Sequence, residues 1–67
     1  MEKLPFRALR ALKKMSQKEV ADKIGVSRMT YANWEKYKTY PDAAQLVMLS
    51  KIFECSLDTF YFPLGTS

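Results

Sequence analysis

The stretch SQKEVADKIGVSRMTYANWE, from Ser16 to Glu35, decides how this chain folds. It opens with a capping box, in which the Ser16 side chain accepts a hydrogen bond from a helical amide while Glu19 reaches back to the amide of the cap. Apolar residues then recur at helical spacing until Gly25, the residue type best able to adopt the left-handed conformation that ends a helix. We therefore predict a helix over residues 17–24.

A second helix follows almost at once. Only the pair Gly25-Val26 separates the helix predicted over residues 17–24 from a new cap, Ser27. The helix predicted over residues 28–36 carries Tyr31 and Trp34 at three-residue spacing, which places both on the face directed at the core. A turn this tight sets two helices at about 90–120°, so that the second one projects from the body. A projecting helix has the shape that enters a DNA major groove, which is about 12 Å wide.

Further helices flank this pair, and we predict them over residues 5–14, 43–54 and 57–61. The first begins at Pro5, which suits the opening turn of a helix. Asp42 and Gln45 form a second capping box. Ser56 is expected to cap the last helix, which Pro63 ends. The expected fold is therefore all-α, a compact five-helix arrangement in a single domain over residues 1–67.

Charge is distributed unevenly along the chain. Residues 1–40 contain ten Lys or Arg against four acidic residues, whereas residues 41–67 contain one Lys against three. The first part therefore has a net charge of +6 and the second of −2, within a total of +4. The basic part can supply an electrostatic footprint for a polyanion. A solvated, lysine-rich surface explains the charge equally well, so charge alone does not decide.

Composition argues against several classes of protein. The chain has no histidine and one cysteine, Cys55, which leaves no zinc-ligand set, no internal disulfide and no acid–base pair of the usual catalytic kind. We interpret Cys55 as a buried or half-buried structural thiol. The sequence has no glycine-rich phosphate loop and no apolar run of about 20 residues. We expect no signal peptide, because the N-terminal residues include no continuous apolar stretch. We expect a cytoplasmic protein that is not an enzyme, needs no cofactor or metal and binds no membrane.

The chain resembles the lambda-repressor-like, or xenobiotic-response-element, family of helix-turn-helix transcriptional regulators, over roughly residues 4–62. The residues that carry the resemblance are Ser16-Gln17, Ala21, Gly25-Val26-Ser27, Trp34-Glu35, Tyr40-Pro41-Asp42, Leu46 and Cys55-Ser56-Leu57-Asp58. The resemblance implies a sequence-specific regulator of transcription that binds double-stranded DNA with its third helix in the major groove.

The resemblance also implies which residues read bases, namely Ser27, Arg28, Met29, Ala32 and Asn33. Arg28 can donate a bidentate pair to guanine, and Asn33 can make the equivalent pair with adenine. Met29 can rest on a thymine methyl group, although the family often has glutamine at this position. The alternative for each is an ordinary exposed helix surface.

Phosphate contacts are expected from Gln17, Thr30, Arg10, Lys36, Lys38 and Tyr40. Gln17 lies at a helix N-terminus, where side chain, backbone amides and helix dipole act together. The resemblance pairs Arg10 with Glu35 in a structural ion pair. Tyr31 replaces the aliphatic residue usual in the family, which leaves room for a partly exposed hydroxyl near the DNA backbone.

The C-terminal segment is rich in apolar residues, and we interpret part of it as a self-association patch, with the candidates Phe60, Tyr61, Phe62 and Leu64. Complete packing within the chain is the alternative. A homodimer would place two copies on half-sites one DNA turn apart. The expected function is a repressor of the phage or mobile-element type. The alternatives are a protein-interaction module, such as an antitoxin or a modulator that binds a toxin or another regulator, and a sequence-neutral nucleoid binder.

Overall fold

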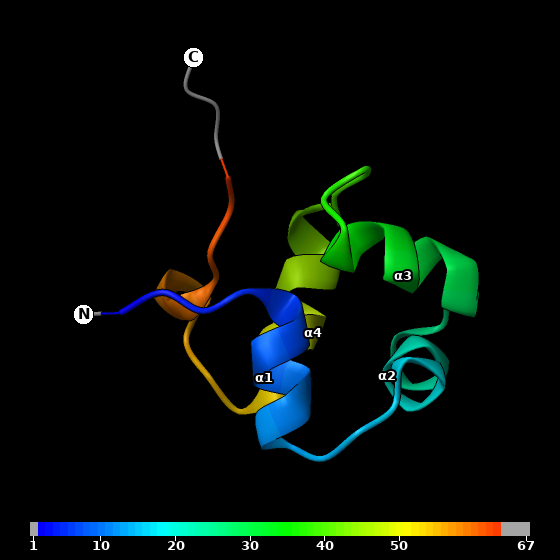
Figure 1. Ribbon diagram of the computed structural model, residues 1–67, viewed down its shortest axis with the longest axis horizontal. Coiled ribbons are helices and arrows are strands. Elements are labelled where there is room, and N and C mark those ends of the chain that lie inside the picture. The colour runs from blue at the N-terminus through cyan, green and yellow to red at the C-terminus, as the bar shows by residue number, and fades with distance from the viewer. Residues whose placement is uncertain (1, 64–67) are drawn as a thin grey trace.

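The computed structural model describes residues 2–63, and within them the chain forms four α-helices with no β-strand. They are α1 (Phe6–Leu12), α2 (Gln17–Ile24), α3 (Arg28–Glu35) and α4 (Ala43–Phe53) (Figure 1). Each lies within two residues of its predicted bounds. None of these helices is long and apolar enough to cross a membrane.

The fifth helix, predicted over residues 57–61, is not confirmed as an α-helix. Residues 57–61 form only a 3₁₀ turn, η1 (Leu57–Thr59), and the Ser56 side chain makes no capping hydrogen bond. The chain then becomes extended, because its backbone pairs with the N-terminal segment instead. The Leu4 amide donates to the Thr59 carbonyl at 2.7 Å, and the Tyr61 amide donates to the Leu4 carbonyl at 2.9 Å. A helix through Tyr61 would have removed these partners from Leu4.

Both predicted capping boxes are present. At the start of α2, the Glu19 amide donates to Ser16 Oγ at 3.0 Å, and the Ser16 amide donates to Glu19 Oε1 at 2.7 Å. At the start of α4, the Gln45 amide donates to Asp42 Oδ1 at 2.8 Å, and the Asp42 amide donates to Gln45 Oε1 at 2.9 Å. These bonds satisfy amides that the first turn of a helix leaves without partners.

The helices end in left-handed residues. Gly25 has φ +85° and its amide donates to the Ala21 carbonyl at 2.8 Å, which closes α2. A β-carbon at Gly25 would meet no other atom, so its backbone angle alone favours glycine there. Helices α1, α3 and α4 are followed by residues that have a positive φ although they are not glycine, namely Lys14, Tyr37 and Glu54. Helix α1 consequently ends at Leu12, before the predicted residue 14.

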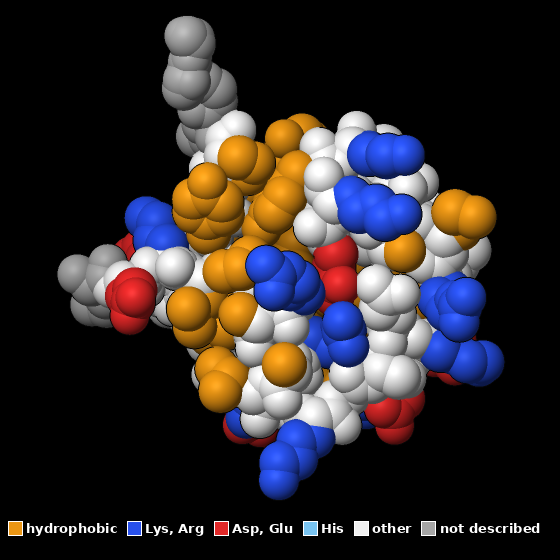
Figure 2. Space-filling view, in the orientation of Figure 1, with side chains coloured by type: hydrophobic (Ala, Val, Ile, Leu, Met, Phe, Trp, Pro, Cys, Tyr) orange, Lys and Arg blue, Asp and Glu red, His pale blue; other side chains and the backbone are white. Residues whose placement is uncertain are grey.

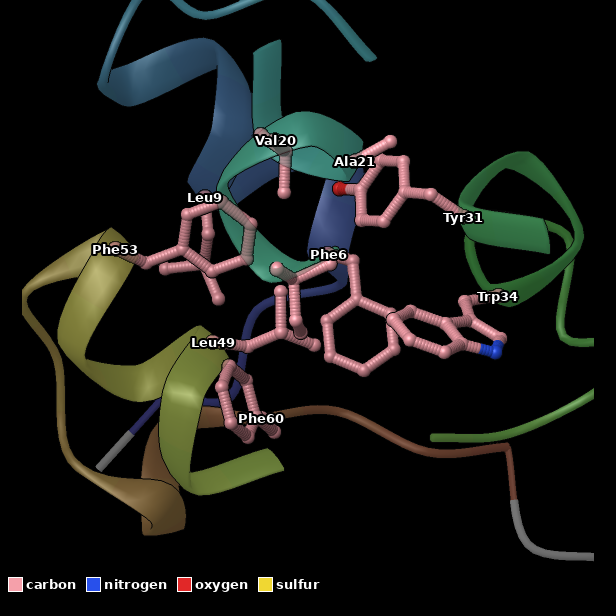
Figure 3. Close-up of a cluster of buried hydrophobic side chains, with 10 residues drawn as sticks. Phe6, Leu9, Val20, Ala21, Tyr31, Trp34, Leu49, Phe53 and Phe60 are labelled. Carbon is pink, nitrogen blue, oxygen red and sulfur yellow. The ribbon is translucent and has the colours of Figure 1, made fainter. Parts of the chain in front are cut away.

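The core lies where the four helices meet (Figure 3). Its buried side chains are Phe6, Leu9, Val20, Ala21, Ile24, Tyr31, Trp34, Leu49, Phe53 and Phe60. Tyr31 and Trp34 belong to this core, as their spacing predicted, and their rings meet edge to face with centroids 6.0 Å apart. Because α3 is anchored by these two rings, its opposite face is directed outward.

The capping box of α2 generates a first prediction. We expect Ser16→Ala to lower the free energy of unfolding by about 1 kcal/mol, since the Glu19 amide loses its partner. Ser56→Ala is the matched control, because Ser56 caps nothing. Urea unfolding followed by circular dichroism measures both, and equal losses for the two variants would contradict the interpretation.

Candidate nucleic-acid interface

Helices α2 and α3 are joined by a short turn that is fixed at both ends. Gly25 ends α2, and Ser27 caps α3 by accepting a hydrogen bond from the Thr30 amide at 3.0 Å. Helix α3 lies along the outside of the molecule, and its first turn lies close to α2 (Figure 1). The first turn of α3 is therefore presented at the surface on a rigid base.

The predicted base-reading residues differ in exposure. Arg28 is exposed, and Met29 is 71% exposed although its side chain is apolar. Within residues 2–63, the Arg28 guanidinium takes part in no ion pair. Ala32 and Asn33 lie one turn further along the helix and are half-buried. The side chains most open to a ligand are thus those of the first turn.

Ser27 is exposed, but its hydroxyl is already engaged. It accepts from the Thr30 amide and donates to Thr30 Oγ1 at 2.9 Å. The Ser27 proton is therefore used inside the cap, and only a lone pair is left for a ligand. The Thr30 hydroxyl accepts that proton, so its own proton can point outward.

The Glu35 carboxylate and the side chains that donate hydrogen bonds to it lie beside this surface, and we call this group the Glu35 hub. Glu35 ends α3, and its side chain is 6% exposed. Arg10 from α1 donates to it through two of its three guanidinium nitrogens, from Nε to Oε2 at 2.6 Å and from Nη2 to Oε1 at 3.2 Å. The remaining nitrogen of the guanidinium, Nη1, donates to the Met15 carbonyl at 3.0 Å. The structure thus joins the two residues that the resemblance pairs.

Two further donors reach the same carboxylate, and sequence reasoning missed both. Gln17 Nε2 donates to Glu35 Oε1 at 2.9 Å, and the Tyr31 hydroxyl donates to Oε2 at 2.6 Å. The Tyr31 side chain is fully buried, so the expectation of a partly exposed hydroxyl is wrong. The four-residue separation of Tyr31 and Glu35, which puts them on one helix face, was the available signal.

The surroundings of Glu35 favour its charged form. Burial by itself would raise the pKa of this carboxyl group, but hydrogen bonds from Arg10, Tyr31 and Gln17 outweigh burial and lower the pKa below its ordinary value. The pKa of Arg10 is raised, chiefly by its hydrogen bond to Glu35. The ion pair is therefore fully charged at neutral pH.

The loop after α3 combines basic and aromatic side chains. Lys36 and Lys38 are exposed, and Tyr40 is 51% exposed. Figure 2 shows basic side chains around α3 and a hydrophobic area between this loop and the C-terminal segment. Tyr37, in the same loop, donates a hydrogen bond from its hydroxyl to the Tyr61 carbonyl at 2.8 Å.

The candidate self-association residues separate into different environments. Phe60 is only 3% exposed and packs edge to face on Phe6 with ring centroids 5.2 Å apart, so its assignment to a surface patch is wrong. Tyr61 is 43% exposed and Phe62 is half-buried. Leu64 lies outside the described residues.

Cys55 is half-buried, and burial raises the pKa of its thiol. This environment keeps the thiol protonated and unreactive at neutral pH. In the part of the chain that the structure describes, no group of three His, Cys, Asp or Glu side chains could hold a metal ion.

Two capped helices at a tight turn, the second with an outward first turn, define a helix-turn-helix protein. The sequence model of the helix-turn-helix family matches residues 6–60. The chain belongs to this family, whose relatives here are transcriptional regulators.

Relatives of known sequence and structure agree with this assignment. The chain is 39% identical over 53 residues to YqaE, an uncharacterized HTH-type transcriptional regulator of Bacillus subtilis, and 36% identical over 53 residues to repressor protein C2 of Salmonella phage P22. These matches cover 79% of this chain but only 46% and 24% of the two relatives. The crystal structure of the P22 c2 repressor in complex with synthetic operator 9T matches with a TM-score of 0.74 and 36% sequence identity, over 79% of this chain and 80% of that one.

The Glu35 hub generates a second prediction. We expect Arg10→Ala to lower the free energy of unfolding by about 2 kcal/mol at neutral pH, because a nearly buried carboxylate loses its cation. Lys13→Ala is the control, since Lys13 pairs with the exposed Glu54 and should matter far less. Urea unfolding measures both, and a similar loss in the two variants would contradict the proposed role of the hub.

The same hub predicts a pH dependence. Because the folded-state pKa of Glu35 is lowered, its contribution to stability is present above the unfolded-state pKa and is lost as the pH falls through the folded-state pKa. The difference between the unaltered protein and Arg10→Ala should therefore shrink on acidification. Unfolding curves recorded from neutral to acidic pH measure this difference, and one that stayed constant would show that the charge of Glu35 is not involved.

Proposed function

We propose that this chain binds double-stranded operator DNA as a homodimer, with α3 in the major groove, and represses transcription by occupying promoter DNA. The observation that carries the proposal is the exposed first turn of α3, where Arg28 has no ion-pair partner among residues 2–63. The 36% sequence identity to the P22 c2 repressor, which was crystallised in complex with a synthetic operator, supports the same function.

Base reading is assigned to the outward side of α3. Arg28 donates two hydrogen bonds to guanine O6 and N7, and Met29 covers a thymine methyl group. Ala32 and Asn33, one turn further along, reach the adjoining bases. Ser27 has a smaller part, as a hydrogen-bond acceptor, because its proton is used in the cap.

Phosphate binding is assigned to the rim around α3. The amide of Gln17 has one proton engaged by Glu35 and a second one free for a phosphate oxygen. The Thr30 hydroxyl and the Arg10 guanidinium also have protons that no hydrogen bond within residues 2–63 uses. Lys36, Lys38 and Tyr40 extend the rim along the loop after α3. These contacts fix the register of the helix without reading sequence.

Self-association is assigned to the exposed side chain of Tyr61 and the half-buried ring of Phe62, together with the exposed Tyr40, whose ring centroid lies 6.2 Å from that of Phe62. Two copies would then contact half-sites one helical turn apart. The cytoplasm, where the promoter lies, is the proposed location.

A protein-interaction module is the second candidate function, favoured by the apolar Met29 at 71% exposure and by the exposed aromatic side chains. In that case α3 or the aromatic surface would bind a toxin or another regulator. Selection of bound DNA from a random pool by the purified chain distinguishes the two. A recurring half-site would support operator binding, and a pool without any enriched sequence would contradict it.

The proposed reading of DNA generates a fourth prediction. We expect Arg28→Ala to weaken binding to the selected operator by about 1–3 kcal/mol and to relax the preference at one base position. Lys51→Ala, which removes the same charge from α4, is the control and should leave that preference intact. Quantitative mobility-shift titration against single-base variants of the site measures both. If Arg28→Ala bound every variant like the unaltered protein, this assignment of α3 would be wrong.

A further inference from the structure

The Tyr31 hydroxyl has no part in the function proposed so far. Its ring is fully buried in the core, yet its oxygen points from α3 toward α2 (Figure 3). There it donates to Glu35 Oε2 at 2.6 Å. A phenylalanine would fill the same space in the core, so packing alone does not account for the hydroxyl.

The hydroxyl completes the coordination of the carboxylate. Glu35 Oε2 accepts from Arg10 Nε and from Tyr31, while Oε1 accepts from Arg10 Nη2 and from Gln17 Nε2. A carboxylate offers about four lone-pair sites, so all of them are filled. The terminal torsion of glutamate is intrinsically broad. Here four donor atoms from three helices hold the Glu35 carboxylate in one orientation.

Among these donors, Tyr31 is the most rigid. Its ring is held on every side by the core and it has only two side-chain torsions, whereas Arg10 and Gln17 are longer and half-buried. Burial and the hydrogen bond to Glu35 both raise the pKa of Tyr31, so that the hydroxyl remains a donor throughout the neutral range. The bond thus has a fixed direction and a fixed origin.

We propose that the Tyr31 hydroxyl is a positioning residue for DNA binding, which holds the Gln17 amide, through Glu35, in the orientation that receives a phosphate. The inference rests on the proposed function and adds to it a residue that does not touch DNA. Without the hydroxyl, one site on Oε2 is empty and the carboxylate turns. Glu35 Oε1 then moves away from Gln17, whose side chain is released into several rotamers. Ordering it again on the DNA costs conformational entropy and weakens binding.

The first test uses the free protein. In Tyr31→Phe, we expect the side-chain amide signals of Gln17 in a ¹⁵N–¹H correlation spectrum to move toward the positions of an exposed glutamine. Tyr37→Phe is the matched control, because it removes a tyrosine hydroxyl that donates to the Tyr61 carbonyl and not to Glu35. Its Gln17 signals should stay in place. Unchanged Gln17 signals in Tyr31→Phe would overturn the proposal.

The second test measures DNA binding at a temperature at which circular dichroism shows every variant to be folded. We expect Tyr31→Phe to weaken binding about 3- to 10-fold, equally for all single-base variants of the operator. Ser56→Ala, which removes a hydroxyl outside the proposed DNA-binding and self-association surfaces, should leave the affinity unchanged. In a Gln17→Ala background, Tyr31→Phe should weaken binding less than about 2-fold, since the side chain that it positions is gone.

The outcomes separate a positioning role from a structural one. If Tyr31→Phe and Gln17→Ala weaken binding independently, the hydroxyl acts through general stability and the proposal is overturned. If Tyr31→Phe fails to fold, Tyr31→Leu removes the same hydroxyl with a residue of the aliphatic type and is judged by the same criteria. Failure of the proposed function is distinguishable, because the unaltered protein would then also bind no selected DNA.

Discussion

The Glu35 carboxylate ties three helices together, since its two oxygens accept hydrogen bonds from Arg10 of α1, Gln17 of α2 and Tyr31 of α3. A carboxylate that is 6% exposed must have its charge and lone pairs satisfied, and here every donor comes from an element that frames the candidate interface. The apolar core already packs α2 and α3 against α1, and the hydrogen bonds of Glu35 add a polar link among the same three helices. Core packing and the polar rim are therefore coupled at Glu35.

The parts of the fold that depend on neighbouring residues could be predicted from the sequence. Both capping boxes and the left-handed Gly25 form within four residues of chain, and their residue types are specific to those geometries. The fifth helix could not be excluded in this way, because its residues pair with Leu4 at the other end of the chain. The same distance concealed the burial of Phe60 against Phe6.

The candidate site was partly predictable for a similar reason. Spacing placed Tyr31 and Trp34 in the core, and the family resemblance implied that Arg28 and Met29 lie on the exposed side of the helix. The structure has all four residues in these positions. Spacing did not show that the cap would occupy the Ser27 proton or that Gln17 would bind Glu35. These contacts are decided by side-chain rotamers and by the approach of separate helices, neither of which leaves a periodic signal in the sequence.

The pairing of Leu4 with Thr59 and Tyr61 has a consequence for how the molecule opens. It consists of two backbone hydrogen bonds that join residues near the two ends of the described chain, and closing so long a loop costs more conformational entropy than closing a short one. Partial unfolding should therefore begin with the loss of these two hydrogen bonds, before α2 and α3 separate. Loss of this pairing would expose Phe60 and the ring of Phe6 beneath it. The exposed aromatic surface would become larger and more prone to associate with other chains, while the candidate interface on α3 stays folded.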